Sequence, residues 1–296
     1  MNNQYILGID TSNYTTSVAL ISPEGVYRDV RRLLSVKEGE RGLRQSTALF
    51  QHIGALPELM TEIMTDFTGK LAAVSVSTRP RPVEGSYMPV FKAGQTVAIS
   101  IAQAMGIPCY EFSHQEGHIE AVRPPKLHRF TALHLSGGTC ELLKVNGTQV
   151  QCIGGSKDIS FGQVIDRVGV AMGTSFPAGK VLDGIAKNAT PSKLLKPIAV
   201  KDNWFNLSGI ESACQRGLSQ GANPEALVGE LFEKLAGVIL ALTPKQEPFV
   251  LVGGVAGSQT IQGYLQEKKN IIVPENNLGS DNAVGVALLG GKKLWQ

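Results

Sequence analysis

Short apolar runs that end in small polar or glycine turns recur along the chain and predict three buried strands. Two of these strands are followed at once by a second apolar run, the pattern of a β-hairpin. The hairpin segments are residues 5–12 with 15–21, and residues 130–139 with 140–145. The third strand, in residues 249–258, passes through Gly253-Gly254 toward a helix near Leu265. Glycines at such a turn allow backbone N–H groups to approach a nucleotide closely.

Between the strands, apolar residues recur at the 3.6-residue spacing of amphipathic helices. We expect helices over residues 49–64, 90–105 and 226–242. Strands that alternate with helices predict an α/β fold. Because a similar hairpin opens each half of the chain, we expect two related lobes, residues 1–125 and 126–296, with a boundary near Pro124-Pro125. The three turns are then expected to face one cleft between the lobes.

Composition narrows the class of protein. Of the 296 residues, 43% are hydrophobic and 18% are charged, as in an ordinary globular protein. The net charge of +3 is too small to indicate nucleic-acid binding by itself. No signal peptide and no apolar run of ~20 residues, the length of a membrane helix, is found in the sequence. The four cysteines lack C-x-x-C spacing, so we expect them to pack as small apolar residues of a cytoplasmic protein.

Two of the five histidines lie four residues apart, in His114-Gln115-Glu116-Gly117-His118. A strand-like run, residues 107–112, precedes them, so the pair is expected at a strand-to-helix junction. Residues at positions i and i+4 of a helix share a face, and both imidazoles can then bind one ion. The order differs from the H-E-x-x-H of zinc peptidases. From spacing alone, a surface helix that happens to carry two histidines is an equally good interpretation.

A set of motifs in the same order resembles the TsaD family of the actin, hexokinase and Hsp70 superfamily, whose members transfer a threonylcarbamoyl group to adenosine of tRNA. The resemblance runs from Gly8 to Gly285. The matching motifs are His114-Gln115-Glu116-Gly117-His118, Ser136-Gly137-Gly138, residues 161–167, Pro177-Ala178-Gly179 with Asp183, residues 205–210, Gly253-Gly254-Val255 and Asp281-Asn282-Ala283. The resemblance implies two lobes of the actin-like ATPase type.

The resemblance also implies a site. It assigns His114, His118 and Asp281 to one divalent metal ion, iron or zinc, although Asp281 could instead cap the apolar helix that follows it. It implies ATP or threonylcarbamoyl-AMP as the ligand. The implied phosphate contacts are Ser136, Gly137, Gly138 and Thr139. Asp166 and Asp183 are implied for the ribose or adenylate, and Gly253, Gly254 and Ser258 for the adenine. Leu135 and Gly179 are implied as further nucleotide-binding residues. Capping or solvation is the alternative role for Asp166 and Asp183. Asp10 is the catalytic candidate, as a residue that orients a water or a metal-bound ligand.

Several departures indicate a short, divergent paralogue. The first turn lacks two carboxylates that the family carries after Ser12, Arg79–Gly85 replaces a Gly-Pro-Gly-Leu loop, and Thr139 stands in place of a histidine.

We expect metal-dependent transfer of a threonylcarbamoyl group from threonylcarbamoyl-AMP to N6 of a tRNA adenosine, aided by partner proteins of the threonylcarbamoyl pathway. The alternative is a non-catalytic or altered-specificity paralogue that binds nucleotide and partners with a true transferase. A basic stretch is the candidate tRNA contact, or simply a solvated face. It consists of Arg28, Arg31, Arg32, Lys37, Arg41 and Arg44.

Overall fold

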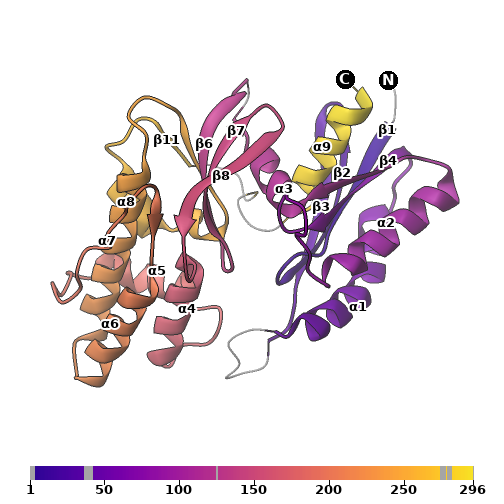
Figure 1. Ribbon diagram of the computed structural model, residues 1–296. Helices are drawn as coiled ribbons and strands as arrows, with labels where there is room; N and C mark the ends of the chain where they lie inside the picture. Colours follow the sequence, from indigo (N-terminus) through magenta and orange to yellow (C-terminus); the bar gives the residue numbers. More distant parts are fainter. Residues whose placement is uncertain (1–3, 37–42, 125, 274–277, 279–281, 296) are drawn as a thin grey trace. The chain divides into compact units, whose positions relative to one another are not determined.

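The computed structural model describes residues 4–36, 43–124, 126–273, 278 and 282–295, and it contains two compact units (Figure 1). The first unit contains the described residues of Met1–Ser35, Leu43–Pro124 and Asn276–Gln296, and the second those of Val36–Gly42 and Pro125–Glu275.

The first unit is built on a five-stranded sheet of order β3-β2-β1-β4-β5. Strands β1, β2 and β3 form an antiparallel meander, and β4 and β5 run parallel to β1. The predicted hairpin is confirmed, with Ile9 opposite Val18 across the ladder. The strands are β1 (Gln4–Asp10), β2 (Thr15–Ser22), β3 (Gly25–Leu33), β4 (Lys70–Arg79) and β5 (Cys109–Ser113).

Helices cover both faces of this sheet because its side chains alternate between them. Leu7 and Ile9 pack with apolar residues of α1 and α2, whereas Ile6 packs on the opposite face with Ala287 of α9. The helices are α1 (Gln45–Met64), α2 (Phe91–Met105), α3 (His114–Ala121) and α9 (Val284–Trp295). Helices α1 and α2 confirm two of the three predicted helices.

The second unit repeats this topology. Its sheet has the order β11-β10-β6-β7-β8-β9, in which β6, β7 and β8 form an antiparallel meander and β10 and β11 run parallel to β6. The strands are β6 (Arg129–Leu135), β7 (Cys140–Asn146), β8 (Gln149–Ser156), β9 (Trp204–Phe205), β10 (Phe249–Val252) and β11 (Ile271–Ile272). The shared order of meander and parallel strands confirms two related α/β units.

The helices of the second unit bury a large apolar core against its sheet. Helix α7 supplies the most extensive apolar face, including Leu231 and Leu235, which pack in one cluster with Leu133 and Leu251 of the strands. The helices are α4 (Phe161–Ala171), α5 (Gly179–Asn188), α6 (Ser208–Ser219), α7 (Pro224–Leu242), the 3-10 turn η1 (Gly254–Gly257) and α8 (Gln259–Leu265). The third predicted helix and the strand, glycine turn and helix after residue 249 are therefore present.

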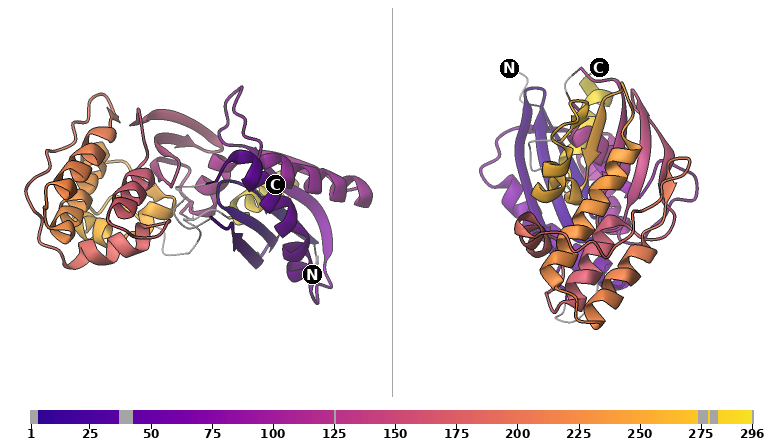
Figure 2. Two further views of the ribbon diagram at one scale, coloured as in Figure 1. Left: turned by 90° about the horizontal axis from the view of Figure 1, so that it is seen from below. Right: turned by 90° about the vertical axis from the view of Figure 1, so that its left-hand side faces the viewer.

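The last helix belongs to the first unit, although the sequence expectation placed all of residues 126–296 in the second lobe. Helix α9 lies beside α3 and the strands of the first sheet (Figures 1 and 2). Small residues allow the close approach: a Cβ on Gly285 would collide with the backbone of Gly117 in α3. The hydroxyl of Ser75 in β4 also donates to the carbonyl of Val286 at 2.6 Å. Such contacts join residues far apart in sequence, so no local pattern predicts them.

Two expectations from composition concern membrane helices and the cysteines. Among the described helices, none is both long and apolar enough to span a bilayer. Cys140 and Cys214 are buried, and burial raises the pKa of each thiol to about 12. Cys152, however, is exposed on β8, so the expectation that every cysteine packs as an apolar residue is wrong for this one.

Candidate functional site

The histidine pair lies at the predicted strand-to-helix junction. Strand β5 ends at Ser113, and α3 begins at the next residue. A reciprocal pair of hydrogen bonds starts the helix: the Glu116 N–H donates to Ser113 Oγ at 3.2 Å, and the Ser113 N–H donates to Glu116 Oε2 at 2.8 Å. This capping box fixes the first turn of α3 and hence the direction in which His114 leaves the backbone.

His114 and His118 lie on one face of α3. Their ring centroids are 4.3 Å apart in an edge-on arrangement. Both side chains are buried, with 7% and 3% of their surface exposed, so the interpretation as a surface helix with two histidines is wrong. Gly117, between them, packs against Gly285 of α9. The C-terminal helix therefore supports the turn that carries both imidazoles.

Asp10, at the end of β1, joins this pair through a buried hydrogen-bond network. Its Oδ2 lies 2.8 Å from His114 Nδ1 and accepts a hydrogen bond from Ser12 Oγ at 3.0 Å. Its Oδ1 accepts from the Ser12 N–H at 3.1 Å and from Ser77 Oγ of β4. The carboxylate is only 1% exposed. Three segments of the first unit thus meet at one carboxylate.

Two of the three predicted metal ligands, His114 and His118, lie within the described residues. Asp281, the third predicted ligand, lies outside the described residues, and within the described ranges no group of three or more His, Cys, Asp and Glu side chains could hold a metal ion. Two imidazoles on one helix face nevertheless suit a transition metal, since imidazole is a common ligand of zinc and iron. The donor chemistry of His114 and His118 therefore fits the implied ion.

In the second unit, two predicted nucleotide turns lie at one edge of the sheet. Strands β6 and β10 are parallel neighbours, with His134 opposite Val252. Leu135 ends β6, so the turn at residues 136–139 and the turn at residues 253–257 follow adjacent strand ends. This edge of an open parallel arrangement is where ligands of α/β proteins usually bind.

The turn at Ser136 is held by its own residues. Ser136 Oγ accepts hydrogen bonds from the N–H groups of Gly138 at 3.3 Å and Thr139 at 2.9 Å. Ser160, the N-cap of α4, donates through its hydroxyl to the Gly137 carbonyl at 2.7 Å. The N–H groups of Gly138 and Thr139, two residues that the resemblance implies for the phosphates, thus already contact Ser136. Ser160 was not singled out from the sequence, although its place three residues before Gln163 is the signature of a capping box.

Gly253 and Gly254 occupy different environments. Gly253 has a φ of +98°, and a Cβ there would collide with the carbonyl of Leu135. Only glycine satisfies that backbone. A Cβ on Gly254 would meet nothing within 4 Å, so the space beside this residue is open.

The two predicted ribose contacts, Asp166 and Asp183, each hold a backbone turn. Asp166 Oδ1 accepts from the Ala178 N–H at 2.8 Å, immediately before Gly179 begins α5. Burial raises the pKa of Asp166 above its usual range. Asp183 accepts from Ser258 Oγ at 2.6 Å and from the N–H of Gln259 at 2.9 Å, at the start of α8.

Asp183 and Ser258 are therefore hydrogen-bonded to each other, and they stabilise the N-terminus of α8. The capping role that the sequence left open is present at Asp183. A ribose contact remains a prediction for both aspartates.

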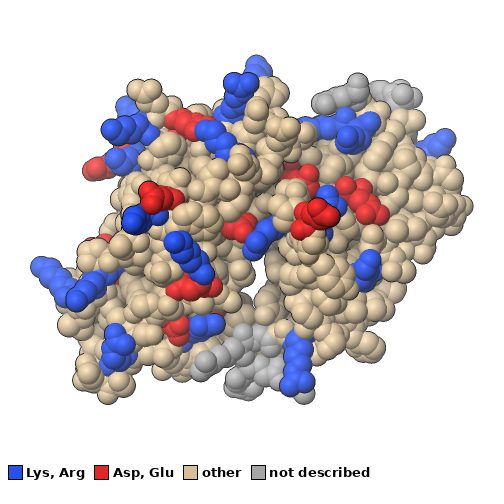
Figure 3. Space-filling model, in the orientation of Figure 1, with Lys and Arg blue, Asp and Glu red and all other residues tan. Residues whose placement is uncertain are grey.

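Three arginines of the predicted basic stretch, Arg28, Arg31 and Arg32, contact the protein itself. Arg31 pairs with Asp29 at 2.5 Å, Arg32 pairs with Glu58, and Lys37 and Arg41 lie outside the described residues. On the face shown in Figure 3, Lys and Arg are scattered among acidic and uncharged residues and form no single patch.

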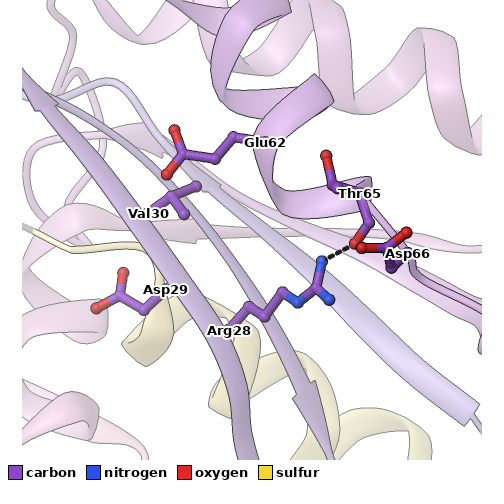
Figure 4. A pocket seen from close by; sticks show the side chains of 6 residues that line it. All are labelled: Arg28, Asp29, Val30, Glu62, Thr65 and Asp66. Atoms are coloured by element: carbon purple, nitrogen blue, oxygen red, sulfur yellow. Dashed lines mark hydrogen bonds between the residues drawn. The ribbon is translucent and has the colours of Figure 1, made fainter.

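Arg28 has a structural role as well. Its guanidinium donates to the carbonyls of Ile63 at 3.0 Å and of Thr65, at the C-terminal end of α1 (Figure 4). The hollow of about 520 Å³ beside it is lined partly by the acidic residues Asp29, Glu62 and Asp66. A cation that satisfies the last carbonyls of a helix stabilises that helix. This hollow therefore has a local structural explanation and lies on different elements from the histidine pair.

Known proteins resemble this chain in sequence and in fold. Residues 38–288 match the TsaD family, described as tRNA N6-adenosine threonylcarbamoyltransferase. Relatives with that name include proteins of Neorickettsia sennetsu and Thermus thermophilus, each 27% identical, covering 99% of this chain and 95% and 93% of the relatives.

Solved structures with a similar fold are more distant in sequence. Component A of the (R)-2-hydroxyglutaryl-CoA dehydratase of Acidaminococcus fermentans is 16% identical, with a TM-score of 0.60 over 99% of both chains. HypF of T. kodakarensis is 13% identical, with a TM-score of 0.63 over 99% of this chain and 48% of HypF.

These likenesses show the class of fold, two α/β units of the actin-like ATPase type. The family follows from the sequence match, which extends over most of the chain. The chain belongs to the TsaD family.

Proposed function

We propose that this protein transfers a threonylcarbamoyl group from threonylcarbamoyl-AMP to N6 of a tRNA adenosine, in the cytoplasm and with partner proteins of that pathway. The observation that carries the proposal is the family match over residues 38–288, which contains the buried histidine pair on one face of α3. The relatives' shared name supplies the reaction and the tRNA substrate.

His114, His118 and Asp281 would hold one divalent metal ion, iron or zinc. Asp281 precedes Gly285 by four residues, and Gly285 packs against Gly117, between the two histidines. This connection supports Asp281 as the third ligand. When bound, the ion would supply Lewis-acid stabilisation of the negative charge that develops during acyl transfer.

The edge formed by the turns after β6 and β10 would hold the nucleotide. The Ser136–Thr139 turn would contact the phosphate, and the open space beside Gly254 would accept the adenine. Ser258 and Asp183 would border the adenosine from the start of α8, and Asp166 would border it from the turn before Gly179. Backbone groups fixed by strand ends and caps are already oriented before the ligand binds, which lowers the entropy cost of binding.

The proposed transfer needs no reactant besides threonylcarbamoyl-AMP and the tRNA adenosine. The N6 amine of adenosine attacks the carbamoyl carbon, and a C–N bond forms. The bond between that carbon and the phosphate oxygen of AMP breaks, AMP leaves with the electron pair, and the amine loses a proton to solvent. The residues of this chain have to hold the amine close to the carbamoyl carbon, because positioning contributes a large part of the barrier reduction in such transfers.

A second candidate is the same transfer to a different acceptor. The Arg79–Gly85 loop, where this chain departs from its family, is attached to α3: the Gln115 N–H, one residue after His114, donates to the Pro80 carbonyl at 3.1 Å. Arg79 and Arg81 therefore flank a residue whose carbonyl contacts the turn that carries His114. This observation favours an altered-specificity paralogue as the alternative.

Metal analysis combined with a transferase assay tests the proposal. Purified protein with its natural partners should contain about one equivalent of iron or zinc and should modify tRNA when given threonylcarbamoyl-AMP. His114→Ala should lose both metal and activity. His128→Ala replaces an exposed histidine of the second unit and is the matched control. Failure of the wild-type chain to modify tRNA, or to replace a deleted family transferase in cells with partners supplied, would favour the altered-acceptor alternative.

A further inference from the structure

The first turn of the chain contains a hydrogen-bond arrangement that the proposed transfer does not by itself explain. Asp10 accepts from Ser12 through both the N–H and the hydroxyl and from Ser77 Oγ, and its Oδ2 lies 2.8 Å from His114 Nδ1. The adjacent Thr11 also points into the protein: its hydroxyl donates to the Val90 carbonyl at 2.9 Å. The Asp10-Thr11-Ser12 triplet is thus engaged inside the first unit.

The donors around Asp10 determine which ring nitrogen of His114 carries a hydrogen. The Ser12 N–H can only donate, so Asp10 must accept there, and an ionised carboxylate can accept from all four groups at once. His114 Nδ1 must then carry a hydrogen. In this tautomer the unprotonated nitrogen is Nε2, and only an unprotonated ring nitrogen can ligate a metal ion.

We propose that Asp10 is a positioning residue that fixes His114 in the Nδ1–H tautomer and thereby presents Nε2 to the metal ion. Carboxylates that accept from the second nitrogen of a metal-ligating histidine orient the ring and raise its basicity. Ser12 and Ser77 hold the carboxylate in turn. The inference rests on the metal site of the proposed function, and it replaces the direct catalytic role expected for Asp10.

A direct role is disfavoured by the geometry of the carboxylate. Asp10 is 1% exposed, and each of its oxygens contacts two donors of the protein. A water or an acyl group would have to displace one of them. Orientation of His114 requires no such displacement.

Asp10→Asn provides the sharpest test. The amide oxygen can replace one carboxylate oxygen toward Ser12 and Ser77, which leaves the NH₂ group facing His114. The NH₂ group donates, so His114 Nδ1 must become the acceptor and the hydrogen must move to Nε2. Long-range ¹H–¹⁵N correlation spectra of the metal-free protein, labelled at histidine, should show this change of tautomer. Metal affinity, measured by chelator competition, should fall by ~10–100-fold.

Matched variants separate positioning from a general structural effect. Asp29→Asn changes an aspartate of the same unit that pairs with Arg31, and it should alter neither the tautomer nor the affinity. Asp10→Glu keeps an acceptor and should retain the Nδ1–H tautomer. If Asp10→Asn does not fold, Ser77→Ala removes one donor to the carboxylate and should weaken metal binding less, with the tautomer kept.

The readouts distinguish this proposal from the transferase proposal. The tautomer is read without metal and without substrate, so it tests Asp10 even if the protein fails to modify tRNA. An unchanged tautomer and unchanged metal affinity in folded Asp10→Asn would overturn the inference. Wild-type protein with the Nε2–H tautomer would overturn it as well.

Discussion

Gly253 and Gly254 are neighbours in the chain, but each is glycine for a different reason. Gly253 has a φ of +98°, and the Leu135 carbonyl occupies the position that its Cβ would take. The backbone conformation therefore requires glycine at this position. Gly254 has open space where a side chain would lie. Gly253 is therefore required for the fold, whereas Gly254 is proposed to be required for nucleotide binding.

Substitution of the two glycines should give opposite results. Gly253→Ala should lower the free energy of unfolding by roughly 1–3 kcal/mol, the usual cost of a strained backbone conformation, and by more if the clash with Leu135 is not relieved. Gly254→Val should change the free energy of unfolding little but should weaken nucleotide binding, because the side chain fills the space proposed for adenine. Urea unfolding and calorimetric titration with ATP measure these effects. Undiminished ATP affinity in Gly254→Val would place the nucleotide elsewhere.

At the scale of an element, α6 depends on a carboxylate from outside its own sequence. Its N-cap, Leu207, has no side chain that can cap, and Asp158 instead accepts from the N–H groups of Leu207 at 2.8 Å and Ser208 at 3.0 Å. Burial acts to raise the pKa of Asp158, but these hydrogen bonds and that of the Ile159 N–H outweigh it and hold the pKa below the usual range.

Asp158→Asn should therefore destabilise the protein in a pH-dependent way. At neutral pH we expect a loss of about 1 kcal/mol, the net value of one hydrogen bond, because the amide keeps only one acceptor oxygen and solvent screens the lost charge of this exposed carboxylate. The folded pKa lies below the unfolded value of ~3.9, so the contribution is present above that pH and is lost as the pH falls toward the folded pKa. Unfolding curves at pH 7 and near pH 3 measure it. A difference between wild type and variant that grows on acidification would contradict this account.

The crossing of α3 and α9 is the second element-scale feature. Gly285 lies so close to the Gly117 backbone that an added Cβ would overlap it. Glycines at both positions allow the helix that carries the histidine pair to pack against the last helix of the chain. The proposed metal site therefore depends on a contact between residues 168 positions apart in the sequence.

Gly285→Ala should separate α3 from α9 and cost roughly 1–3 kcal/mol of unfolding free energy, as overpacking usually does. The displaced histidines should also bind metal more weakly. Gly54→Ala is the matched control, since Gly54 lies on the exposed face of α1 with nothing within 4 Å, and alanine there should stabilise by up to ~1 kcal/mol. Thermal unfolding and metal competition compare the two. Equal stability of both variants would mean that α9 tolerates a shift.

At the scale of the whole molecule, the first unit is discontinuous because it needs the last helix. Helix α9 covers one face of the first sheet through Ala287 and Val286, and the Ala283 N–H donates to Ser17 Oγ at 2.7 Å. The second unit contains its own core, in which α7 packs against β6 and β10.

Removal of residues 284–296 should consequently affect one unit more than the other. Loss of α9 exposes Ile6, Ile21 and Ala73, so amide hydrogen exchange in β1 and β4 should accelerate strongly. Protection in β6 and α7 should remain. Exchange measured by mass spectrometry resolves the two units, and an equal loss of protection in both would contradict the division.

The sequence by itself determined the features that depend on local periodicity. The two hairpins, the helices α1, α2 and α7, and the placement of His114 and His118 on one helix face follow from spacings of two and 3.6 residues, which act over a few neighbours. The ordered motifs also led to the family. The hairpins, the helices and the placement of the histidines need no knowledge of the remainder of the chain.

Only the tertiary structure decided the contacts between distant residues. It assigned α9 to the first unit, brought Asp10 to His114, paired Asp183 with Ser258, and neutralised Arg31 and Arg32 with carboxylates. The physical reason is common to all of them. A side chain's local pattern indicates whether it is buried, but its partner depends on which strand ends and helix faces the fold brings together.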